Sequence, residues 1–242
     1  DISQMRSDEY SQNLQAATSE QLLEFALNRK NNIGIAYTYN EPLINFEFIL
    51  DTAQLFKKNN LKNVLVSNGY INEAPLNELL PFIDAANIDL KGIGESFYKD
   101  NCKAGSPADI LRSIEILFKN NIIIEVTNLI VTGLNDEQSQ IRRLVDSVHS
   151  LSPDIPLHFS RYYPRYKYAA EQTAVETLNF AFDYAKTKQK YVYIGNIHSN
   201  YASNTYCYNC GELLIKRLGY NTKSYLDAGR CQKCKTRIFG YF

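Results

Sequence analysis

Four of the five cysteines in this chain stand in two close pairs near its C-terminal end. The pairs are Cys207 with Cys210 and Cys231 with Cys234, so the spacing is C-x2-C, twenty residues, C-x2-C. Two tight knuckles of this kind can present four thiolates to one tetrahedral zinc ion. Gly211 follows the first pair, where a knuckle needs an unusual backbone angle, whereas Lys235 follows the second. The spacing therefore predicts one metal ion bound by all four cysteines.

Zinc is one of three interpretations of this spacing. Two disulfides are the second, and a reducing cytosol disfavours them. An iron–sulfur site is the third and the main rival. Because cysteine fills all four ligand positions, no position is open for catalysis, and we expect a structural site that stabilises a small domain at residues 203–242. The fifth cysteine, Cys102, is interpreted as a small, partly buried loop residue in preference to a reactive thiol.

Five short polar segments lie where apolar, strand-like runs of the sequence end. They are residues 38–42 (Thr-Tyr-Asn-Glu-Pro), 67–70 (Ser-Asn-Gly-Tyr), 89–92 (Asp-Leu-Lys-Gly), 131–134 (Val-Thr-Gly-Leu) and 158–161 (His-Phe-Ser-Arg). In a parallel α/β sheet or barrel, the C-terminal ends of the strands meet at one edge. Residues distant in sequence can therefore build one site there, although any one segment alone is weak evidence.

Hydrophobic patterning indicates the elements that must position these segments, because apolar runs alternate with amphipathic stretches. Strands are predicted at Ile33–Tyr39, Asn63–Ser67, Ala86–Leu90, Ile122–Val131, Leu157–Tyr162 and Tyr191–Ile197. Helices are predicted at Ser19–Arg29, Leu43–Lys58, Glu73–Pro81, Pro107–Asn120, Asp136–Ser150 and Glu171–Lys188. This alternation requires crossover connections and therefore a parallel sheet. An open doubly wound sheet is the alternative, but six units without a Gly-rich phosphate loop favour a barrel or partial barrel.

The same segments, in this order, resemble a known family. Followed by Gly195-Asn196-Ile197 and the four cysteines, they are similar to the radical S-adenosylmethionine (SAM) enzymes of the AmmeMemoRadiSam system, which are relatives of pyruvate formate-lyase activating enzymes. The resemblance covers essentially the whole chain. It implies an α/β fold, a partial (β/α)6 TIM-like radical SAM barrel at residues 1–200 that lacks its first strand, followed by a C-terminal zinc ribbon at residues 203–242.

The chain departs from this family in one important respect. Radical SAM enzymes hold a [4Fe–4S] cluster with a C-x3-C-x2-C loop, and no such triplet occurs in these 242 residues. In the family, a segment like Asp1-Ile2-Ser3-Gln4 comes shortly after that loop. The resemblance therefore implies that the N-terminal cluster-binding segment is absent and that the cluster ligands lie outside this chain. We expect the chain alone to be inactive.

The resemblance also implies where SAM would bind. Tyr39, Asn40 and Glu41 match a Gly-Gly-Glu-Pro-type motif whose backbone and acid accept hydrogen bonds from the SAM ammonium. Glu41 has a second role available, as a favourable charge at the start of the following helix, and both roles can hold together. Asn68 is expected to bind the ribose or the methionine carboxylate, although an Asn-Gly turn at a strand exit needs no ligand.

Four further residues complete the predicted site. Asp89 and Lys91 stand two residues apart, so on a strand their side chains point the same way, and a buried pair of this kind is costly unless both groups are satisfied. We interpret them as a functional pair near the SAM carboxylate and the transferred hydrogen. Val131 resembles a segment that packs on adenine, although a strand-ending turn explains it equally. His158 resembles a histidine near the ribose or substrate, with a structural role as the alternative.

The charge balance of the chain gives no general argument for an anionic partner. Lys and Arg number 26 and so do Asp and Glu, so neither nucleic acid nor an anionic membrane is expected. The basic residues of the ribbon are interpreted as a solvated face. No apolar run approaches the roughly 20 residues that span a bilayer, and no signal peptide is visible. A cytoplasmic protein with no membrane partner is therefore expected.

Two functions of different classes follow from the sequence. The first, implied by the resemblance, is radical SAM chemistry, in which SAM is cleaved reductively to a 5′-deoxyadenosyl radical that abstracts hydrogen from an unknown substrate, with an activase-like action on a protein as one form. Memo-like and AMMECR-type proteins are partners that the resemblance implies. The second is a non-catalytic module that binds SAM or a nucleotide and uses its ribbon for a partner. The absent cluster motif favours the second, and the retained strand-end residues favour the first.

Overall fold

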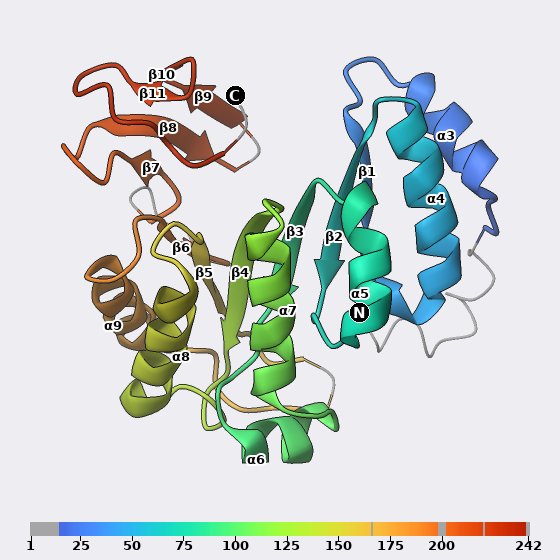
Figure 1. The fold of residues 1–242 in the computed structure, drawn as a ribbon. Helices are drawn as coiled ribbons and strands as arrows, with labels where there is room; N and C mark the ends of the chain where they lie inside the picture. The colour runs from blue at the N-terminus through green and yellow to red at the C-terminus, as the bar shows by residue number, and fades with distance from the viewer. Residues whose placement is uncertain (1–14, 166, 198–201, 220, 241–242) are drawn as a thin grey trace. The chain divides into compact units, whose positions relative to one another are not determined.

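The computed structural model describes residues 15–165, 167–197, 202–219 and 221–240, and it divides into two compact units (Figure 1). Unit 1 comprises Asp1–Asp89 and Ala108–Ile124, and unit 2 comprises Leu90–Pro107 and Glu125–Phe242. The segment Asp1–Gln4, on which part of the resemblance depends, lies outside the described residues.

Unit 1 is built on three parallel strands, with β2 between its two neighbours. They are β1 (Gly34–Tyr37), β2 (Lys62–Ser67) and β3 (Ala85–Asp89). The helices are α3 (Ser19–Leu27), α4 (Phe46–Lys58), α5 (Glu73–Leu79) and α7 (Pro107–Lys119), whose first residue belongs to unit 2, with the short helices η1 (Pro42–Asn45) and η2 (Leu80–Phe82). In the register, Leu65 is opposite both Tyr37 and Ala86, so the C-terminal ends of the three strands lie at one edge.

The predicted helix Leu43–Lys58 is divided in the structure. Pro42 begins the 3₁₀ helix η1, and the α-helix α4 begins only at Phe46. Ile49, Ala53 and Phe56 are buried on one face of α4, which packs on β1 and β2 (Figure 1). Burying a side chain the size of Phe56 contributes about 1.5–3 kcal/mol. The helix therefore holds the segment between β1 and β2 against the sheet.

Unit 2 contains the other parallel strands and the cysteine pairs. Its strands are β4 (Ile123–Ile130), whose first two residues belong to unit 1, β5 (Leu157–Arg161) and β6 (Val192–Gly195), and β5 pairs with both neighbours. Its helices are α6 (Glu95–Phe97), the π-helical turn η3 (Tyr98–Cys102), α8 (Gln138–Leu151) and α9 (Val175–Lys186). The antiparallel strands β7 (Thr205–Tyr206), β8 (Leu213–Leu218), β9 (Asn221–Ser224), β10 (Leu226–Asp227) and β11 (Arg230–Cys231) follow.

The helix predicted from Glu171 begins four residues later, at Val175, because Thr173 is already engaged with β4 and β5. Its buried hydroxyl donates to the Ile130 carbonyl at 2.6 Å and accepts the Tyr162 N–H at 2.9 Å. Its backbone N–H and carbonyl are also bonded, to Tyr162 and Arg161. A residue held in this way on both sides cannot join a helical turn.

Each predicted strand and helix overlaps an element of the structure, and the α/β class is confirmed. Closure into a barrel and the boundary between residues 200 and 203 remain predictions, and residues 198–201 lie outside the described part. Among the described helices, none combines the length and the apolar character that crossing a membrane requires.

Asp84, just before β3, gives unit 1 a defined dependence on pH. Its Oδ1 accepts from Lys57 at 2.9 Å and Lys62 at 3.1 Å, and its Oδ2 accepts the Asn63 N–H at 3.0 Å. Burial raises the pKa of Asp84. The hydrogen bond from the Asn63 N–H and the ammonium groups of Lys57 and Lys62 together lower the pKa by more than burial raises it, so the pKa lies below its ordinary value. The stabilisation is present above the unfolded pKa, about 3.9, and is lost as the pH falls through the lower folded pKa.

Replacing this carboxylate by an amide should therefore matter at neutral pH and not in acid. We expect Asp84→Asn to lower the free energy of unfolding by about 1 kcal/mol at about pH 7, with little difference from wild type at about pH 2. Urea unfolding of both proteins at the two pH values measures this, with the exposed Asp51→Asn as the control. An equal loss at both values would contradict the assignment.

Candidate functional site

Glu41 joins the ends of two neighbouring strands in unit 1. Its Oε1 accepts the Ser67 hydroxyl at 2.7 Å and the Leu43 N–H at 3.2 Å, and its Oε2 accepts the Asn68 N–H at 2.8 Å. Glu41 therefore also caps η1, the structural role that the sequence left open. A carboxylate offers about four acceptor positions. One therefore remains for an external donor such as an ammonium group.

Asn68 is arranged to donate outward. Its Oδ1 accepts the Tyr70 N–H at 2.8 Å, and its Nδ2 has no partner among the described residues. Gly69 has a φ of 70°, and a Cβ there would come within 2.7 Å of the Ile88 side chain. A residue with a side chain would be strained at position 69, so the turn requires glycine. The NH2 group of Asn68 is left available to a ligand. Ser67, by contrast, is buried and uses its hydroxyl on Glu41 and Gly69.

Two of the predicted residues lie beyond the strand that was expected to carry them. The sequence predicts a strand to Tyr39, but β1 ends at Tyr37. Tyr39 is 81% exposed, and Asn40 is exposed as well. They are next to Glu41 in the chain, with their side chains on the surface of unit 1.

Asp89 lies beside Asn68, because Ser67 is opposite Ile88 in the register of β2 and β3. Three predicted residues, Glu41, Asn68 and Asp89, are therefore brought to one edge of unit 1. The same-face argument for Asp89 and Lys91 does not hold, because β3 ends at Asp89 rather than at Leu90. Lys91 belongs to unit 2, where its N–H donates to the Tyr98 hydroxyl at 3.0 Å.

Two buried asparagines that the sequence reasoning missed hold the segment around Lys91. Asn128 donates to the Leu90 carbonyl at 2.8 Å, and Asn135 donates to the Lys91 carbonyl at 2.6 Å. Asn135 also accepts the Val131 N–H at 2.6 Å, and the Val131 carbonyl accepts from two residues of its own turn. Packing is therefore the role left to Val131. The sequence offered one sign of this arrangement, because Asn128 is a polar residue at a position where the alternation of the strand predicts a buried apolar one.

His158 has neighbours of its own on β4 and β6. In the register, His158 is opposite Thr127 and Tyr193, and its ring stacks on Tyr193 with centroids 4.8 Å apart. Its Nε2 lies 3.1 Å from Oε2 of Glu125, an ion-pair distance without hydrogen-bond alignment. Val131 lies four residues beyond Thr127, about 13 Å along the strand. The structure therefore does not bring His158 and Val131 together.

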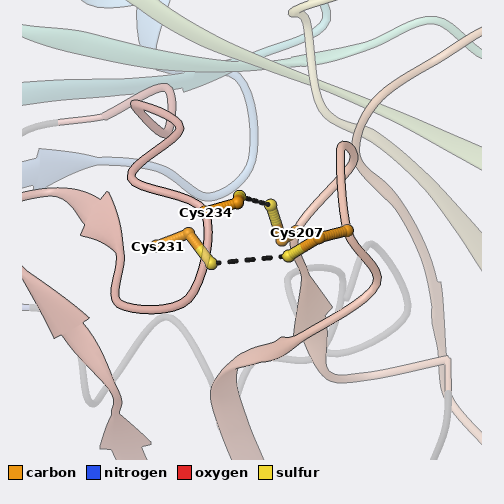
Figure 2. Close-up of side chains that lie close together, drawn as sticks. Cys207, Cys231 and Cys234 are labelled. Atoms are coloured by element: carbon orange, nitrogen blue, oxygen red, sulfur yellow. Dashed lines mark hydrogen bonds between the residues drawn. The ribbon is translucent and has the colours of Figure 1, made fainter.

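The four paired cysteines converge on one point, and Figure 2 labels three of them, Cys207, Cys231 and Cys234. Their sulfur atoms all lie within 4.8 Å of one another. The closest approaches are 3.5 Å between Cys207 and Cys234 and 3.7 Å between Cys210 and Cys231. None of these cysteines is in a disulfide, which does not support the disulfide interpretation. The geometry is that of a group able to hold a single ion.

The two knuckles have the same backbone turn. The Gly211 N–H donates to the Cys207 carbonyl at 2.8 Å, and the Lys235 N–H donates to the Cys231 carbonyl at 2.9 Å. The φ angles of Gly211 and Lys235 are 74° and 60°. The expectation of an unusual angle after each pair is thus confirmed, with Lys235 adopting the left-handed conformation in place of the commoner glycine.

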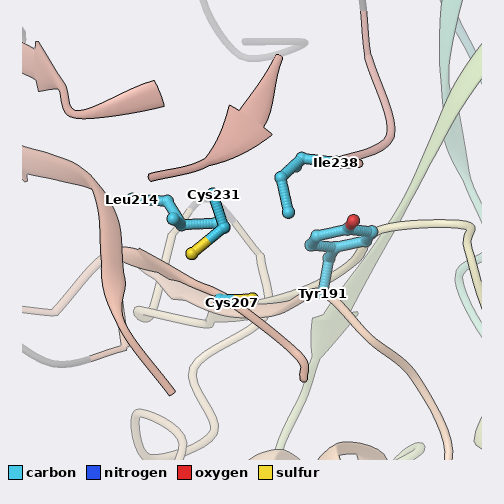
Figure 3. Close-up of a cluster of buried hydrophobic side chains, with 5 residues drawn as sticks. All are labelled: Tyr191, Cys207, Leu214, Cys231 and Ile238. Atoms are coloured by element: carbon cyan, nitrogen blue, oxygen red, sulfur yellow. The ribbon is translucent and has the colours of Figure 1, made fainter. Parts of the chain in front are cut away.

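Cysteine side chains also form much of the core of this small region (Figure 3). The buried cluster consists of Tyr191, Cys207, Leu214, Cys231 and Ile238. Tyr191 directly precedes β6, so the cysteine region packs at the N-terminal end of that strand. Tyr193, Ile215, Leu226 and Phe239 pack against this cluster but are only partly buried, and a core this small agrees with the expectation that a metal stabilises it.

The thiols of the cluster differ in acidity. Hydrogen bonding from Thr236 lowers the pKa of Cys234 to about 5. The Glu212 N–H lowers the pKa of Cys210, but burial and the three other sulfurs outweigh it and raise the value to about 12. Four adjacent thiols cannot all ionise without a cation, and a bound divalent ion would favour the thiolate at each.

Cys102 does not join this group. It ends the π-helical turn η3 and is half-buried. Burial raises the pKa of its thiol, and the charge of Lys91 offsets this only in part. A thiol that ionises less readily is a weaker nucleophile and ligand, which supports the structural interpretation.

The model of the radical SAM superfamily matches residues 3–148. This is more than half of the chain, and the protein therefore belongs to the radical SAM superfamily. The match includes the Glu41 and Asn68 edge of unit 1.

Named relatives extend this result. An uncharacterized protein of Methanocaldococcus jannaschii is 41% identical over 227 residues, covering 91% of this chain and 67% of that protein. The 4-hydroxyphenylacetate decarboxylase activating enzyme of Clostridium scatologenes is 24% identical over 49% of this chain and 38% of the enzyme. The pyruvate formate-lyase-activating enzyme of Clostridium pasteurianum is 24% identical over 55% of this chain and 58% of the enzyme. The chain thus spans about two thirds of the archaeal relative and less of the two activating enzymes.

Solved structures share the fold. A domain of a pyruvate-formate lyase-activating enzyme from Bacteroides vulgatus matches with a TM-score of 0.58 at 16% identity, covering 67% of this chain and 99% of that domain. SuiB of Streptococcus suis, bound to S-adenosylmethionine, matches with a TM-score of 0.60 at 13% identity, covering 76% of this chain and 45% of SuiB. At these identities the likeness concerns the fold alone.

Proposed function

We propose that this chain is the SAM-binding and substrate-facing part of a radical SAM enzyme that resembles activating enzymes and belongs to the AmmeMemoRadiSam branch. Membership of the superfamily and the similarity to two activating enzymes support the enzyme class. The resemblance carried by the strand-end segments supports the branch. A protein substrate, Memo-like and AMMECR-type partners and a cytoplasmic location belong to the same proposal.

The observation that carries this proposal is the edge formed by Glu41, Asn68 and Asp89. Glu41 keeps one acceptor position after its three internal bonds, which suits the ammonium of SAM. Asn68 keeps both hydrogens of its amide, which suit the methionine carboxylate or a ribose oxygen. A donor and an acceptor fixed side by side match a ligand that carries both an ammonium and a carboxylate. The residues present therefore fit SAM.

The residues present do not fit a [4Fe–4S] cluster at this edge. The superfamily implies such a cluster, which supplies the electron that cleaves SAM, but the chain has no C-x3-C-x2-C loop. The four-cysteine group is no substitute, because a closed set of four thiolates leaves no coordination position for SAM. We propose, as the resemblance implies, that the cluster cysteines precede Asp1 in the full protein.

A non-catalytic binding module is the less favoured function. Such a module would also bind SAM or a nucleotide, so the open positions on Glu41 and Asn68 do not distinguish it; the similarity to two activating enzymes favours the enzyme. Zinc in the four-cysteine group remains the proposed metal, since a closed set of four thiolates is the usual structural zinc site.

SAM affinity tests this proposal directly. In the protein extended by its upstream coding sequence, we expect Glu41→Ala and Asn68→Ala each to weaken SAM binding by roughly 10- to 100-fold, since a charge-assisted hydrogen bond is worth about 1.5–3 kcal/mol. Isothermal titration calorimetry with SAM measures the effect. Glu47→Ala, an exposed acid of the first turn of α4, is the matched control and should bind as wild type does. Wild-type affinity in both site variants would remove the basis of the proposal.

A further inference from the structure

Tyr193 of β6 stands between His158 and the four-cysteine region of unit 2. One face of its ring stacks on His158, with centroids 4.8 Å apart and planes inclined by 27°. Its hydroxyl shares a 2.7 Å hydrogen bond with Thr205 Oγ1, in β7. The Arg217 guanidinium of β8 lies 5.3 Å from the centre of the same ring. A single side chain therefore contacts a predicted site residue and the cysteine region together.

Thr205 is itself fixed by the cysteine region. Arg217 Nη1 donates to Thr205 Oγ1 at 2.8 Å and to the Ser203 carbonyl at 3.1 Å, and the Arg217 N–H donates to Asn204 at 2.7 Å. Thr205 lies two residues before Cys207, the first cysteine of the metal group, and β7 pairs with β8. Loss of the metal would release the knuckle that β7 leads into. The position of the Thr205 hydroxyl thus depends on the fold of the knuckle.

On its other side, Tyr193 restricts the orientation of the His158 imidazole. One face of the imidazole lies against the Tyr193 ring. The Nε2 atom is fully buried and lies 3.1 Å from Oε2 of Glu125. The side chain is 28% exposed, so Nδ1 is the nitrogen left to face a ligand. Rotating the ring by a half-turn about its Cβ–Cγ bond would put a carbon in the place of each nitrogen. The orientation that the stack and Glu125 maintain therefore decides what His158 can offer.

We propose that Thr205 and Tyr193 are positioning residues for His158, and that the orientation of its imidazole depends on metal binding by the four cysteines. The catalytic meaning of this coupling rests on the proposed function, in which His158 faces the ribose or the substrate. The coupling itself does not, because it consists of contacts within unit 2. The cysteine region would then have a second task beyond its own folding, which is to keep a residue of the parallel sheet in place.

Proton NMR of the 242-residue chain tests the coupling between metal binding and the His158 ring, and it requires no measurement of enzyme activity. The chain contains three histidines, and the His158→Gln variant assigns the His158 ring signals by their disappearance. A stacked tyrosine ring shields the imidazole protons. We expect Thr205→Val and Tyr193→Phe, which each remove the hydrogen bond, to move the His158 signals downfield. Removal of the metal by a chelator should move them in the same direction and further.

Thr222→Val is the matched control, because Thr222 is an exposed residue of β9 in the same region, and it should leave the His158 signals unchanged. The metal content of each variant is measured beside the spectra. If Thr205→Val loses its metal, the test of the coupling rests on Tyr193→Phe. This variant removes the same hydrogen bond by changing the residue in β6 and leaves the cysteine region unaltered. His158 signals that stay at their wild-type positions in Tyr193→Phe, or in the metal-free chain, would overturn the coupling. Failure of SAM to bind would instead overturn the proposed function and leave these shifts unaffected.

Discussion

The 242-residue chain, reconstituted anaerobically with iron and sulfide and then given dithionite and SAM, is expected to release no 5′-deoxyadenosine above the no-protein control. The reason lies in the positions of its cysteines. Four of the five converge on one group whose sulfurs lie within 4.8 Å of one another, and the fifth, Cys102, is alone in η3 with its pKa raised by burial. The 242 residues therefore hold no C-x3-C-x2-C triplet of thiolates for a cluster.

The positive control is the protein translated with its upstream coding sequence, assayed in the same way. If that sequence carries a C-x3-C-x2-C loop, the extended protein should release 5′-deoxyadenosine, and serine at the three cysteines of the loop should abolish the release. Liquid chromatography of the quenched reaction measures the product. Product formation by the 242-residue chain itself would contradict the prediction and would require cluster ligands other than this triplet.

The alternation of apolar and polar residues was enough to predict the strands, because β2, β3, β4 and β6 each have one buried face. In β4, for example, Ile124, Val126 and Ile130 are fully buried, whereas Glu125 is only partly so. The ends of the strands were predicted less well. The sequence predicts that the third strand continues to Leu90, whereas β3 ends at Asp89. Leu90 is buried, as strand residues are, but its carbonyl accepts a hydrogen bond from the side chain of Asn128. Burial alone does not distinguish a strand residue from a buried turn.

The residues of the candidate site were easier to find than their partners. Glu41 and Asn68 stand in recognisable segments, but their link through Ser67 depends on the register of β1 and β2, which the sequence does not contain. The same holds for Glu125 beside His158, which are 33 positions apart in the chain and meet only because β4 and β5 are paired. Contacts between distant residues need the register, and the register comes from packing.

The cysteine region is the part of the chain whose stability should depend most on a bound ion. Purified protein is expected to contain about one zinc per chain by elemental analysis. Among the described residues, Cys207 and Cys231 belong to a core of five buried residues with six partly buried ones packed against it, which is small for the strands β7 to β11. Structural zinc contributes an apparent 10 to 16 kcal/mol, on the order of the whole stability of a domain. Metal binding and folding should therefore be inseparable here.

We accordingly expect Cys231→Ser to lose the metal and to unfold this region while the parallel strands and their helices persist. Trypsin should then cleave rapidly at the basic residues after position 203, although far-ultraviolet circular dichroism still shows the helices. Cys102→Ser is the matched control, because it removes a cysteine that lies outside the metal group, and it should retain both the metal and the resistance to trypsin. Stoichiometric iron with thiolate charge-transfer absorbance would make the group an iron–sulfur site instead of a zinc site. Full metal content in Cys231→Ser would show that the four cysteines do not act together, since the loss of one thiolate from a closed tetrahedral set leaves the ion without its complete coordination.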